Sequence, residues 1–427
     1  MRILKIISIT LALAILTSQA WATSKPKTDL LGGVSVMSFG AKGDGKTDDT
    51  AAFQKAMDSL KVHGGVVLAP TGKYLIAGSL KMPQNVALTG VWQGPHLSTM
   101  KGTVILATGG EGDENGKPLF DMDWNTCVKG LTIIYPNQKP SKIVPYPWTF
   151  MGKGMHCVIE NVTLANPYKA IAFPVWNEMH YIKNVYGCPL KEGIFVDRCT
   201  DIGRIEDVHF NPNYWTRMNM AEPWPKADLQ SLDKFLRENL VAYHIGKTDW
   251  EYMTNCFCIL AKIGYHFVKT ANGNGNAVLT QCGADGTTIS VQVDSCQPHA
   301  GIAFVNSQFM AGVIISDTNN GPVKFSNCGF WPYGGINNQA RLDGNGMVMF
   351  TSCHFQGWAQ KDPEAPCIVA TAGALIVNGC DFFAAGKRQV TLGERVGSAA
   401  ITSNFLRGGQ KITNNSKGSV QIGLNTE

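Results

Sequence analysis

Apolar residues after residue 36 fall in short runs that turn residues separate. Between residues 66 and 88 there are three such runs of three residues each, divided at Pro70, Gly78 and Pro83, which is typical of short strands joined by tight turns. Residues 50–60 differ, because their apolar positions recur at helical spacing. This order predicts a strand, a Gly-rich turn, one short helix and then a series of strands.

The predicted helix has its own start signals. Thr47 is the expected N-cap, and Asp48 and Asp49 lie in the first turn, where the helix dipole favours anions. Asp44 precedes a glycine and has the chemistry of a turn. We therefore assign this early acidic cluster to the turn and the helix start, and not to catalysis. The buried stripe of the helix is predicted to consist of Phe53, Ala56, Met57 and Leu60.

Two series of hydrophobic residues recur at a nearly constant interval. Five Phe residues in the C-terminal half each end a short strand and lie 21 to 27 residues apart, and three Val residues upstream lie 23 apart. Intervals of this length are those of one coil in a solenoid. Since each residue alone would be ordinary core, we predict rungs and not a ligand site. The residues are Phe309, Phe330, Phe355, Phe382, Phe405, Val162, Val185 and Val208.

The segment 36–90, which runs from VMSFGAKGDGKTDDT to NVALTG, resembles the N-terminal part of the pectate lyase superfamily of right-handed β-helices, which includes polygalacturonase-like and rhamnogalacturonase-like enzymes. The resemblance implies an all-β, right-handed parallel β-helix (solenoid) with an N-terminal capping helix. The polygalacturonase motifs Asn-Thr-Asp, Gly-His-Gly and Arg-Ile-Lys do not occur in the chain, and its only Asp-Asp lies at the capping helix. No catalytic residue of those enzymes is therefore carried over, and polygalacturonase activity is disfavoured.

One segment, residues 211–243, interrupts the rhythm of the strands. Four Leu residues at helical spacing follow two Pro residues, which predicts a helical insertion near residues 223–241. Insertions in solenoids gather on one face, often the binding face. Tyr214, Trp215 and Trp224 flank this helix. We expect Tyr214 and Trp215 to bind substrate by stacking on sugar rings, and the alternative is that they pack the helix onto the coil.

An acidic pair follows this insertion. If residues 249–252 form a strand of period two, Asp249 and Glu251 share its outer face with Cα atoms about 6.5 to 7 Å apart. Trp250 and Tyr252 would then point into the coil. Outward carboxylates at this separation match the acid and base, or acid and nucleophile, of glycoside hydrolysis. We therefore predict Asp249 and Glu251 as catalytic residues, against the alternative of two solvated surface acids.

Ionisable residues are dense between residues 178 and 209, in a chain with only 16% charged residues. Adjacent rungs lie about 4.8 Å apart, so side chains at matching offsets become neighbours, and this density predicts a cleft. His266, His299 and His354 have no such company in the sequence and are expected to be structural. The expected substrate-binding residues of the cleft are His180, Lys183, Asp197, Arg198, Arg204 and His209.

The front of the chain has the three parts of a secretory signal peptide. A basic start is followed by an apolar run from Ile6 to Leu16 and by the Ala-Trp-Ala site that ends at Ala22. The apolar run is too short for a membrane anchor. We predict removal of residues 1–22, a single β-helix domain over residues 23–427, and a secreted or periplasmic location. The formal charge of +5 falls to about +3 on cleavage, which is too small to argue for a nucleic-acid partner.

Twelve Cys residues in an exported chain suggest disulfides, but their setting favours buried thiols. Cys328, Cys353 and Cys380 occupy the same place in three consecutive repeats, where a free Cys acts as a small apolar filler. The alternative is one or two disulfides among four earlier residues, and the spacing argues against a zinc site. Those four residues are Cys127, Cys157, Cys188 and Cys199.

These observations favour an exported glycoside hydrolase that acts on a polysaccharide. The runner-up is a polysaccharide lyase, in which Lys183, Arg198, Arg204 or His209 would serve as the base and an arginine or a calcium ion would neutralise a uronate. No metal or other cofactor is otherwise expected, since Asp121-Met122-Asp123 alone is weak evidence for a calcium loop. A non-catalytic glycan-binding solenoid is the third alternative. A homotrimer is considered because some β-helices form trimers.

Overall fold

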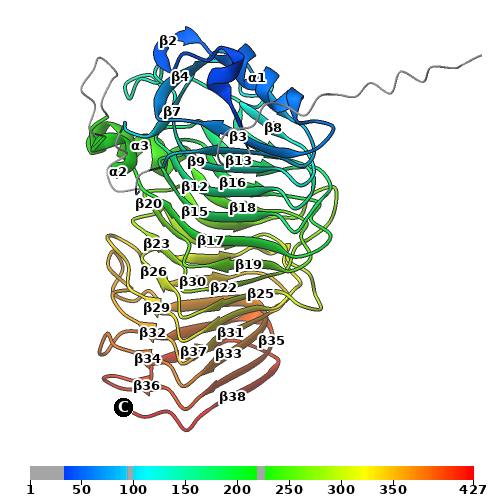
Figure 1. Ribbon diagram of the computed structural model, residues 1–427. Helices are drawn as coiled ribbons and strands as arrows, with labels where there is room; N and C mark the ends of the chain where they lie inside the picture. The colour runs from blue at the N-terminus through cyan, green and yellow to red at the C-terminus, as the bar shows by residue number, and fades with distance from the viewer. Residues whose placement is uncertain (1–32, 93, 95–99, 219–226) are drawn as a thin grey trace, which may run out of the picture.

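The computed structural model describes residues 33–92, 94, 100–218 and 227–427. The predicted signal peptide and Trp224 lie outside these residues. Parallel strands stack rung on rung from the N-terminal end, drawn in blue, to the C-terminal end, drawn in red (Figure 1). This arrangement confirms the predicted all-β parallel β-helix. No helix within the described ranges is both long and apolar enough to cross a membrane.

Each coil contributes to three ladders of parallel strands, which we number 1 to 3. Ladder 1 contains the strand of each coil that comes before the long turn. Its strands are β5 (Leu80–Met82), β8 (Phe120–Met122), β10 (Trp148–Gly152), β13 (Lys169–Phe173), β16 (Glu192–Val196), β18 (Val241–Ile245), β21 (Ile263–Phe267), β24 (Ile289–Val293), β27 (Val313–Ile315), β30 (Ala340–Leu342), the first halves of β33 (Ile368–Asn378) and β35 (Val390–Thr402), and β37 (Ile412–Asn414).

Ladder 2 follows that turn, and several of its strands continue around a bend into ladder 3. Its strands are β1 (Val34–Ser35), β3 (Gly65–Ala69), β6 (Val86–Gly90), the first halves of β9 (Cys127–Ile134), β12 (Val158–Leu164), β15 (Tyr181–Gly187) and β17 (Gly203–Phe210), then β19 (Glu251–Thr254), β22 (Ala277–Thr280), β25 (Ile302–Val305), β28 (Val323–Ser326), β31 (Met347–Thr351), the second halves of β33 and β35, and β38 (Ser419–Gly423).

Ladder 3 completes each coil. Its strands are β2 (Asp44–Asp48), β4 (Gly72–Ile76), β7 (Thr103–Ala107), the second halves of β9, β12, β15 and β17, then β20 (Phe257–Ile259), β23 (Gly283–Asp285), β26 (Gln308–Phe309), β29 (Gly329–Phe330), β32 (His354–Phe355), β34 (Asp381–Phe382) and β36 (Phe405–Leu406). A two-stranded pair, β11 (Gly154–Met155) and β14 (Asn177–Glu178), lies at the long turn between ladders 1 and 2.

The bend between ladders 2 and 3 needs one residue with positive φ in each coil. Asn161, Asn184, Asp207, Asn255 and other residues at this offset have φ between 52° and 56°. Asn and Asp are the non-glycine residues that tolerate this conformation best. Their side chains also bond from rung to rung, because Asn184 Nδ2 donates to Asn161 Oδ1 at 2.6 Å and Asn255 Nδ2 donates to Asp207 Oδ1 at 2.8 Å.

The N-terminal end is capped by a short 3₁₀ helix, η1 (Val36–Phe39), and by α1 (Thr50–Ser59), which confirms the predicted capping helix. The expected N-cap was wrong, because the cap is Asp49 and Thr47 lies in β2. The carboxylate of Asp49 instead accepts the backbone N–H groups of Lys42 and Gly43 at 2.7 and 3.1 Å. The acidic cluster therefore fixes the Gly-rich turn, as the sequence suggests.

Stacked rings fill the C-terminal half of the coil. Phe330 packs on Phe355 and Phe355 on Phe382 with centroids 4.7 and 4.9 Å apart. These predicted rungs are confirmed, whereas Phe405 is 57% exposed because Leu406, and not Phe405, pairs with Phe382. All twelve Cys residues are free thiols, and all but Cys127 are buried, so the filler interpretation is confirmed.

The predicted insertion contains α2 (Asn213–Thr216) and α3 (Leu229–Asn239). The Asp228 carboxylate caps α3 by accepting the N–H of Ser231 at 2.8 Å. Leu232 and Leu236 are buried against the coil. Both helices lie on the side of the stack that carries the labels of ladder 3 (Figure 1), so the insertion borders the turn between ladders 3 and 1.

Candidate functional site

The predicted catalytic pair does not form an outward pair of carboxylates. Trp250 has a φ of 65°, which interrupts the strand before β19 begins at Glu251. The alternation is therefore reversed: Glu251 is 0% exposed, whereas Trp250 and Tyr252 are 55% and 42% exposed. Asp249 lies on the preceding turn, where it pairs with Lys247 and accepts a hydrogen bond from Gln297 Nε2 at 2.7 Å. The expected orientation was wrong, and the geometric argument for this pair is lost.

Glu251 belongs instead to a buried polar network inside the coil. Its Oε1 lies 2.9 Å from Nε2 of His180, and its Oε2 accepts the Thr248 hydroxyl at 3.0 Å. The other ring nitrogen of His180 lies 2.9 Å from Oδ1 of Asn177. Burial opposes a charge on His180, but the Glu251 carboxylate outweighs this effect and raises the pKa of His180 to about 10. The network is therefore an imidazolium–carboxylate pair with its polar atoms satisfied.

Gly203 gives this pair the space to form. His180, Gly203 and Glu251 occupy the same position on three consecutive rungs, as the pairing of the residues that follow them shows. Gly203 therefore lies between His180 and Glu251. A Cβ on Gly203 would lie 2.3 Å from Glu251 Oε2 and 2.4 Å from His180 Cε1. The absence of a side chain at Gly203 thus allows His180 and Glu251 to bond across the rung between them. The pair thereby links the coil before the insertion to the coil after it.

The same location holds the one group of potential metal ligands found within the described residues. Donor atoms of His180, Cys199 and Glu251 all lie within 4.8 Å of one another, and all three residues are buried. Two of the three donors already satisfy each other as an ion pair, and Cys199 Sγ lies 3.4 Å from the Asp201 carbonyl. These contacts favour a structural role for the three residues over a metal site. We call the His180–Glu251 ion pair, which links two coils, a structural lock.

The other expected substrate-binding residues are dispersed. Asp197 is buried in the turn after β16, where it accepts the N–H of Lys247 and the Thr270 hydroxyl, both at 2.9 Å. Arg198 follows it with a φ of 55°, and the side chain of Trp215, a residue of α2, is fully buried. Trp215 therefore has the packing role that was the alternative, and its expected stacking on sugar is wrong.

Three of the predicted residues, Lys183, Arg204 and His209, lie on the outside of ladders 2 and 3, whereas Tyr214 belongs to α2 and is buried, so its expected stacking on sugar is wrong. Lys183 and Arg204 both place their cations over the ring of Tyr181, at 5.8 and 5.1 Å from its centroid. His209 and Tyr214 lie further along, with the Tyr214 hydroxyl 3.2 Å from His209 Nδ1. The predicted cleft thus divides into two surface groups, while His180 and Asp197 belong to the interior and to a turn.

A row of ionisable side chains that the sequence analysis did not select lies on the outer face of ladder 1. His244 of β18 and His266 of β21 occupy one register position, and their rings stack at 5.2 Å with 10° between planes. His244 Nδ1 lies 3.4 Å from Glu192 Oε2, and His266 Nε2 lies 2.7 Å from Asp294 Oδ2. We call Glu192, His244, His266 and Asp294 the histidine face. All four side chains are partly exposed.

The electrostatics of this row keep one of its carboxylates charged. Hydrogen bonds from His266, Ser316 and Gln292 outweigh the burial of Asp294 and lower its pKa to about 2. Asp294 is therefore anionic at neutral pH and orients the imidazole of His266 through Nε2. A carboxylate that fixes an imidazole in this way is the arrangement used for proton transfer in many enzymes.

An aromatic platform adjoins the histidine face. Phe195 pairs in register with His244 on the neighbouring strand. Its ring stacks on Trp148 at 6.4 Å and lies tilted against His244, with centroids 5.0 Å apart. Lys169 pairs in register with Glu192 and places its Nζ 5.4 Å from the centroid of Trp148. Flat rings beside a cation and two oriented imidazoles can hold a sugar ring and exchange protons with it.

The sequence contains a repeat that indicates the stacking of His244 on His266. The peptides Tyr243-His244-Ile245 and Tyr265-His266-Phe267 are similar and lie 22 residues apart, each with a Lys two residues later. A repeat at the coil interval places both imidazoles on one face at adjacent rungs. The expectation that His266 has no ionisable neighbours was wrong, because its neighbours come from other rungs.

Comparison with known proteins bears on the fold and on one end of the chain. The profile of the family described as rhamnogalacturonase A/epimerase, pectate lyase-like, matches residues 33–117. A probable glucan endo-1,3-beta-glucosidase of Arthroderma benhamiae is 38% identical over 96 residues, which cover 21% of this chain and 11% of that protein. Alginate lyase 7 of Azotobacter vinelandii is 44% identical over 68 residues, or 14% of this chain and 8% of that protein. The chain thus spans only a small part of these relatives.

Solved structures resemble the chain over most of its length. The A-module of mannuronan C-5 epimerase AlgE6 of Azotobacter vinelandii has a TM-score of 0.53 and 15% identity, and the match covers 92% of this chain and 98% of that one. The N-terminal fragment of bacteriophage phi29 gene product 12 has a TM-score of 0.58 and 14% identity, and the match covers 92% and 71%. At these identities the similarity shows the fold alone.

Proposed function

From the premise that this chain is a pectate lyase-like parallel β-helix, we propose that it is a carbohydrate-processing enzyme and that the histidine face is its active site. The observation that carries the proposal is the pair of stacked imidazoles, His244 and His266, each held by its own carboxylate on a partly exposed sheet face. The relatives with carbohydrate-active names support the general class, although each matches only part of the chain.

The geometry favours β-elimination on a uronate-containing glycan. In this reaction a base removes the proton on the carbon next to the carboxylate, the bond to the leaving oxygen breaks, a carbon–carbon double bond forms, and an acid protonates the leaving oxygen. Two adjacent imidazoles provide a base and an acid within reach of one sugar. Lys169, which is 9% exposed beside Glu192, would provide the cation for the uronate carboxylate. The ring of Phe195 supports the sugar from below.

Hydrolysis is the second candidate, because the chain resembles a glucan endo-1,3-beta-glucosidase over 96 residues. Glycoside hydrolysis commonly uses two carboxyl groups between about 5 and 9.5 Å apart. Glu192 begins β16 and Asp294 follows β24, and these two strands lie three rungs apart, which is about 14 Å at the usual strand spacing. A hydrolase built on this face would therefore use an imidazole as one member of its acid–base pair. This difference in spacing is why we place elimination first.

The test is incubation of the purified protein with a panel of neutral and uronate-containing polysaccharides. Reducing ends and the ultraviolet absorbance of an unsaturated uronate are followed together. Elimination predicts both signals, and hydrolysis predicts reducing ends alone. If neither signal appears with any polysaccharide while glycan binding is retained, the enzyme proposal is contradicted and the non-catalytic solenoid is favoured. We also propose that the chain is exported after cleavage near Ala22, which mass spectrometry of the mature N-terminus would test.

A further inference from the structure

A hollow lies away from the histidine face, on the outside of ladder 3. Tyr186, Asp207, His209, Asn255 and Phe257 line a cavity of about 350 Å³. Its walls are rings, because Phe257 packs edge-on against His209 at 5.6 Å and Tyr214 lies 5.7 Å from Tyr186. Trp92 stacks on Tyr186 at 6.2 Å. Rings that remain accessible in a polar hollow offer flat apolar surfaces to a ligand.

The polar groups of this hollow are arranged to bind hydroxyls. Asn255 Nδ2 donates to Asp207 Oδ1, so the second carboxylate oxygen and the amide oxygen face other partners. Burial lowers the pKa of His209. The neutral ring that results has one donor and one acceptor, and because Nδ1 already contacts the Tyr214 hydroxyl at 3.2 Å, Nε2 is the nitrogen left for a ligand. A carboxylate, an amide and a neutral imidazole together match the mixed donor and acceptor pattern of a sugar.

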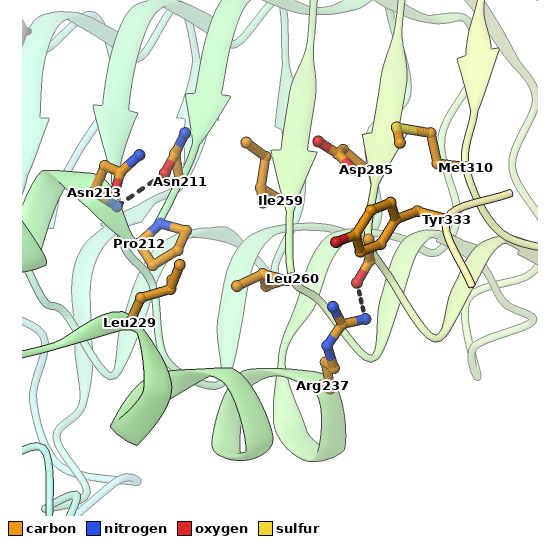
Figure 2. A pocket seen from close by; sticks show the side chains of 11 residues that line it. Asn211, Pro212, Asn213, Leu229, Arg237, Ile259, Leu260, Asp285, Met310 and Tyr333 are labelled. Atoms are coloured by element: carbon orange, nitrogen blue, oxygen red, sulfur yellow. Dashed lines mark hydrogen bonds between the residues drawn. The ribbon is translucent and has the colours of Figure 1, made fainter. Parts of the chain in front are cut away.

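A second hollow of about 280 Å³ lies between the coil and α3. Figure 2 shows Asp285, Ile259 and Leu260 from the coil facing Arg237 of α3, with Tyr333 and Met310 at one end. Tyr333 is 72% exposed. Burial raises the pKa of Asp285, although the nearby Arg237 opposes this effect. Arg237 itself bonds to Asp233 at 2.9 Å and to the carbonyl of Gly286.

Strand β20 connects the two hollows. Phe257 lines the first hollow and Ile259 the second, while Cys258 between them is buried. Residues two apart on a strand share a face and lie about 6.5 to 7 Å apart. The neighbouring rung continues in the same way, because His209 of β17 lines the first hollow and Asn211, the residue after β17, lines the second. We call the combined surface the side groove.

We propose that the side groove is a second saccharide-binding site, and that it binds a run of uncharged sugars. The accessible rings of Phe257, Tyr186 and Tyr333 would stack on the apolar faces of sugar rings. Asp207 and Asp285 would accept sugar hydroxyls, and two carboxylates would repel a uronate. Arg237 is already committed to Asp233 and Gly286, so the groove has no matching cation for an acidic sugar among the residues that line it in the described part of the chain.

The side groove is independent of the reaction at the histidine face. It lies on ladder 3, whereas the histidine face lies on ladder 1, which is a different side of the coil. A glycan bound in the side groove would hold the protein on a neutral polysaccharide while another chain is processed. Saccharide binding in the side groove can therefore be tested separately from catalysis at the histidine face.

Calorimetric titration with linear neutral gluco-oligosaccharides and with mannuronate oligosaccharides of equal length tests this site. We expect the neutral series to bind and Tyr333→Ala to weaken that binding at least fivefold. Trp331→Ala is the matched control, since Trp331 is an exposed ring on the same loop that does not line the groove. Trp331→Ala and His266→Ala should leave the affinity unchanged.

Three results would overturn the proposal. The first is no binding of the neutral series, and the second is tighter binding of the mannuronates. The third is an affinity that depends on His266 and not on Tyr333, which would assign all binding to the histidine face. Asp207→Asn provides a further check, because Asn keeps the positive φ and the bond to Asn255. Its thermal stability should match the parent protein, while its affinity for the neutral series falls.

Discussion

Two histidine–carboxylate pairs in this protein have the same chemistry and opposite surroundings. The side chains of His180 and Glu251 are both 0% exposed inside the coil, whereas those of His266 and Asp294 are 15% and 32% exposed on its outer face. A buried pair cannot reach a polymer, but its removal leaves an uncompensated charge in the core. An exposed pair contributes little to stability, but it can exchange protons with a substrate. Burial thus separates the structural pair from the pair that we propose to be functional.

The largest effect on stability is expected from loss of the interior pair. Glu251→Ala leaves His180 buried without its partner, which costs about 3–5 kcal/mol. Denaturant unfolding, followed by circular dichroism, measures this cost. The matched control is Asp249→Ala, which removes a partly exposed carboxylate from the neighbouring turn and should cost less than about 1 kcal/mol. Equal costs for the two variants would contradict the assignment of Glu251 as a structural lock.

A smaller loss is expected when the space between the pair is filled. Gly203→Ala places a Cβ 2.3 Å from Glu251 Oε2, and such overpacking costs about 1–3 kcal/mol. Gly397→Ala is the control, because its nearest neighbour would lie at 3.7 Å. The melting temperatures of the two variants give the comparison. The role of Gly203 is wrong if both variants melt together with the parent protein.

The two pairs should also differ in their dependence on pH, which is the smallest effect. The pKa of His180 is raised from 6.5 to about 10, so its stabilisation is complete below pH 6.5 and is lost as pH rises through 10. The pKa of Asp294 is lowered from 3.8 to about 2, so its stabilisation is present above pH 3.8 and is lost as pH falls through 2. Both variants, Glu251→Gln and Asp294→Asn, should therefore melt below the parent at neutral pH, and their melting curves should converge with it at opposite ends of the pH range: Glu251→Gln as pH rises through 10, and Asp294→Asn as pH falls through 2.

The sequence predicts the fold well because the fold repeats. The Phe and Val series and the Cys positions each recur at one offset, and a recurring offset is visible without coordinates. The capping helix was predicted from its apolar stripe, although its N-cap was misplaced by two residues. Phe405 does not join the stacked Phe rings, because in the final coil the next residue, Leu406, pairs with Phe382.

The candidate site was predicted less well for two physical reasons. The period-two argument for Asp249 and Glu251 needs a regular strand, but Trp250 adopts a positive φ that no residue pattern announces. The ionisable cluster at residues 178–209 also spans several faces of the coil, so density along the chain did not mean proximity in space. The useful signal was the similar peptides at residues 243–245 and 265–267, because equal offsets on adjacent rungs do become neighbours.

The central claim is that the outward pair acts on substrate and the inward pair does not. The most direct measurement is the two-signal polysaccharide assay on His266→Gln and on His354→Gln. His354 forms another outward pair, with Nδ1 3.1 Å from Asp381 Oδ2, but it lies on ladder 3 away from the histidine face. We predict that His266→Gln lowers the rate about 10²- to 10⁴-fold, as expected for loss of a general acid or base. His354→Gln should retain the parent rate, and both variants should melt like the parent. Full activity in His266→Gln, or an equal loss in both variants, would contradict the account.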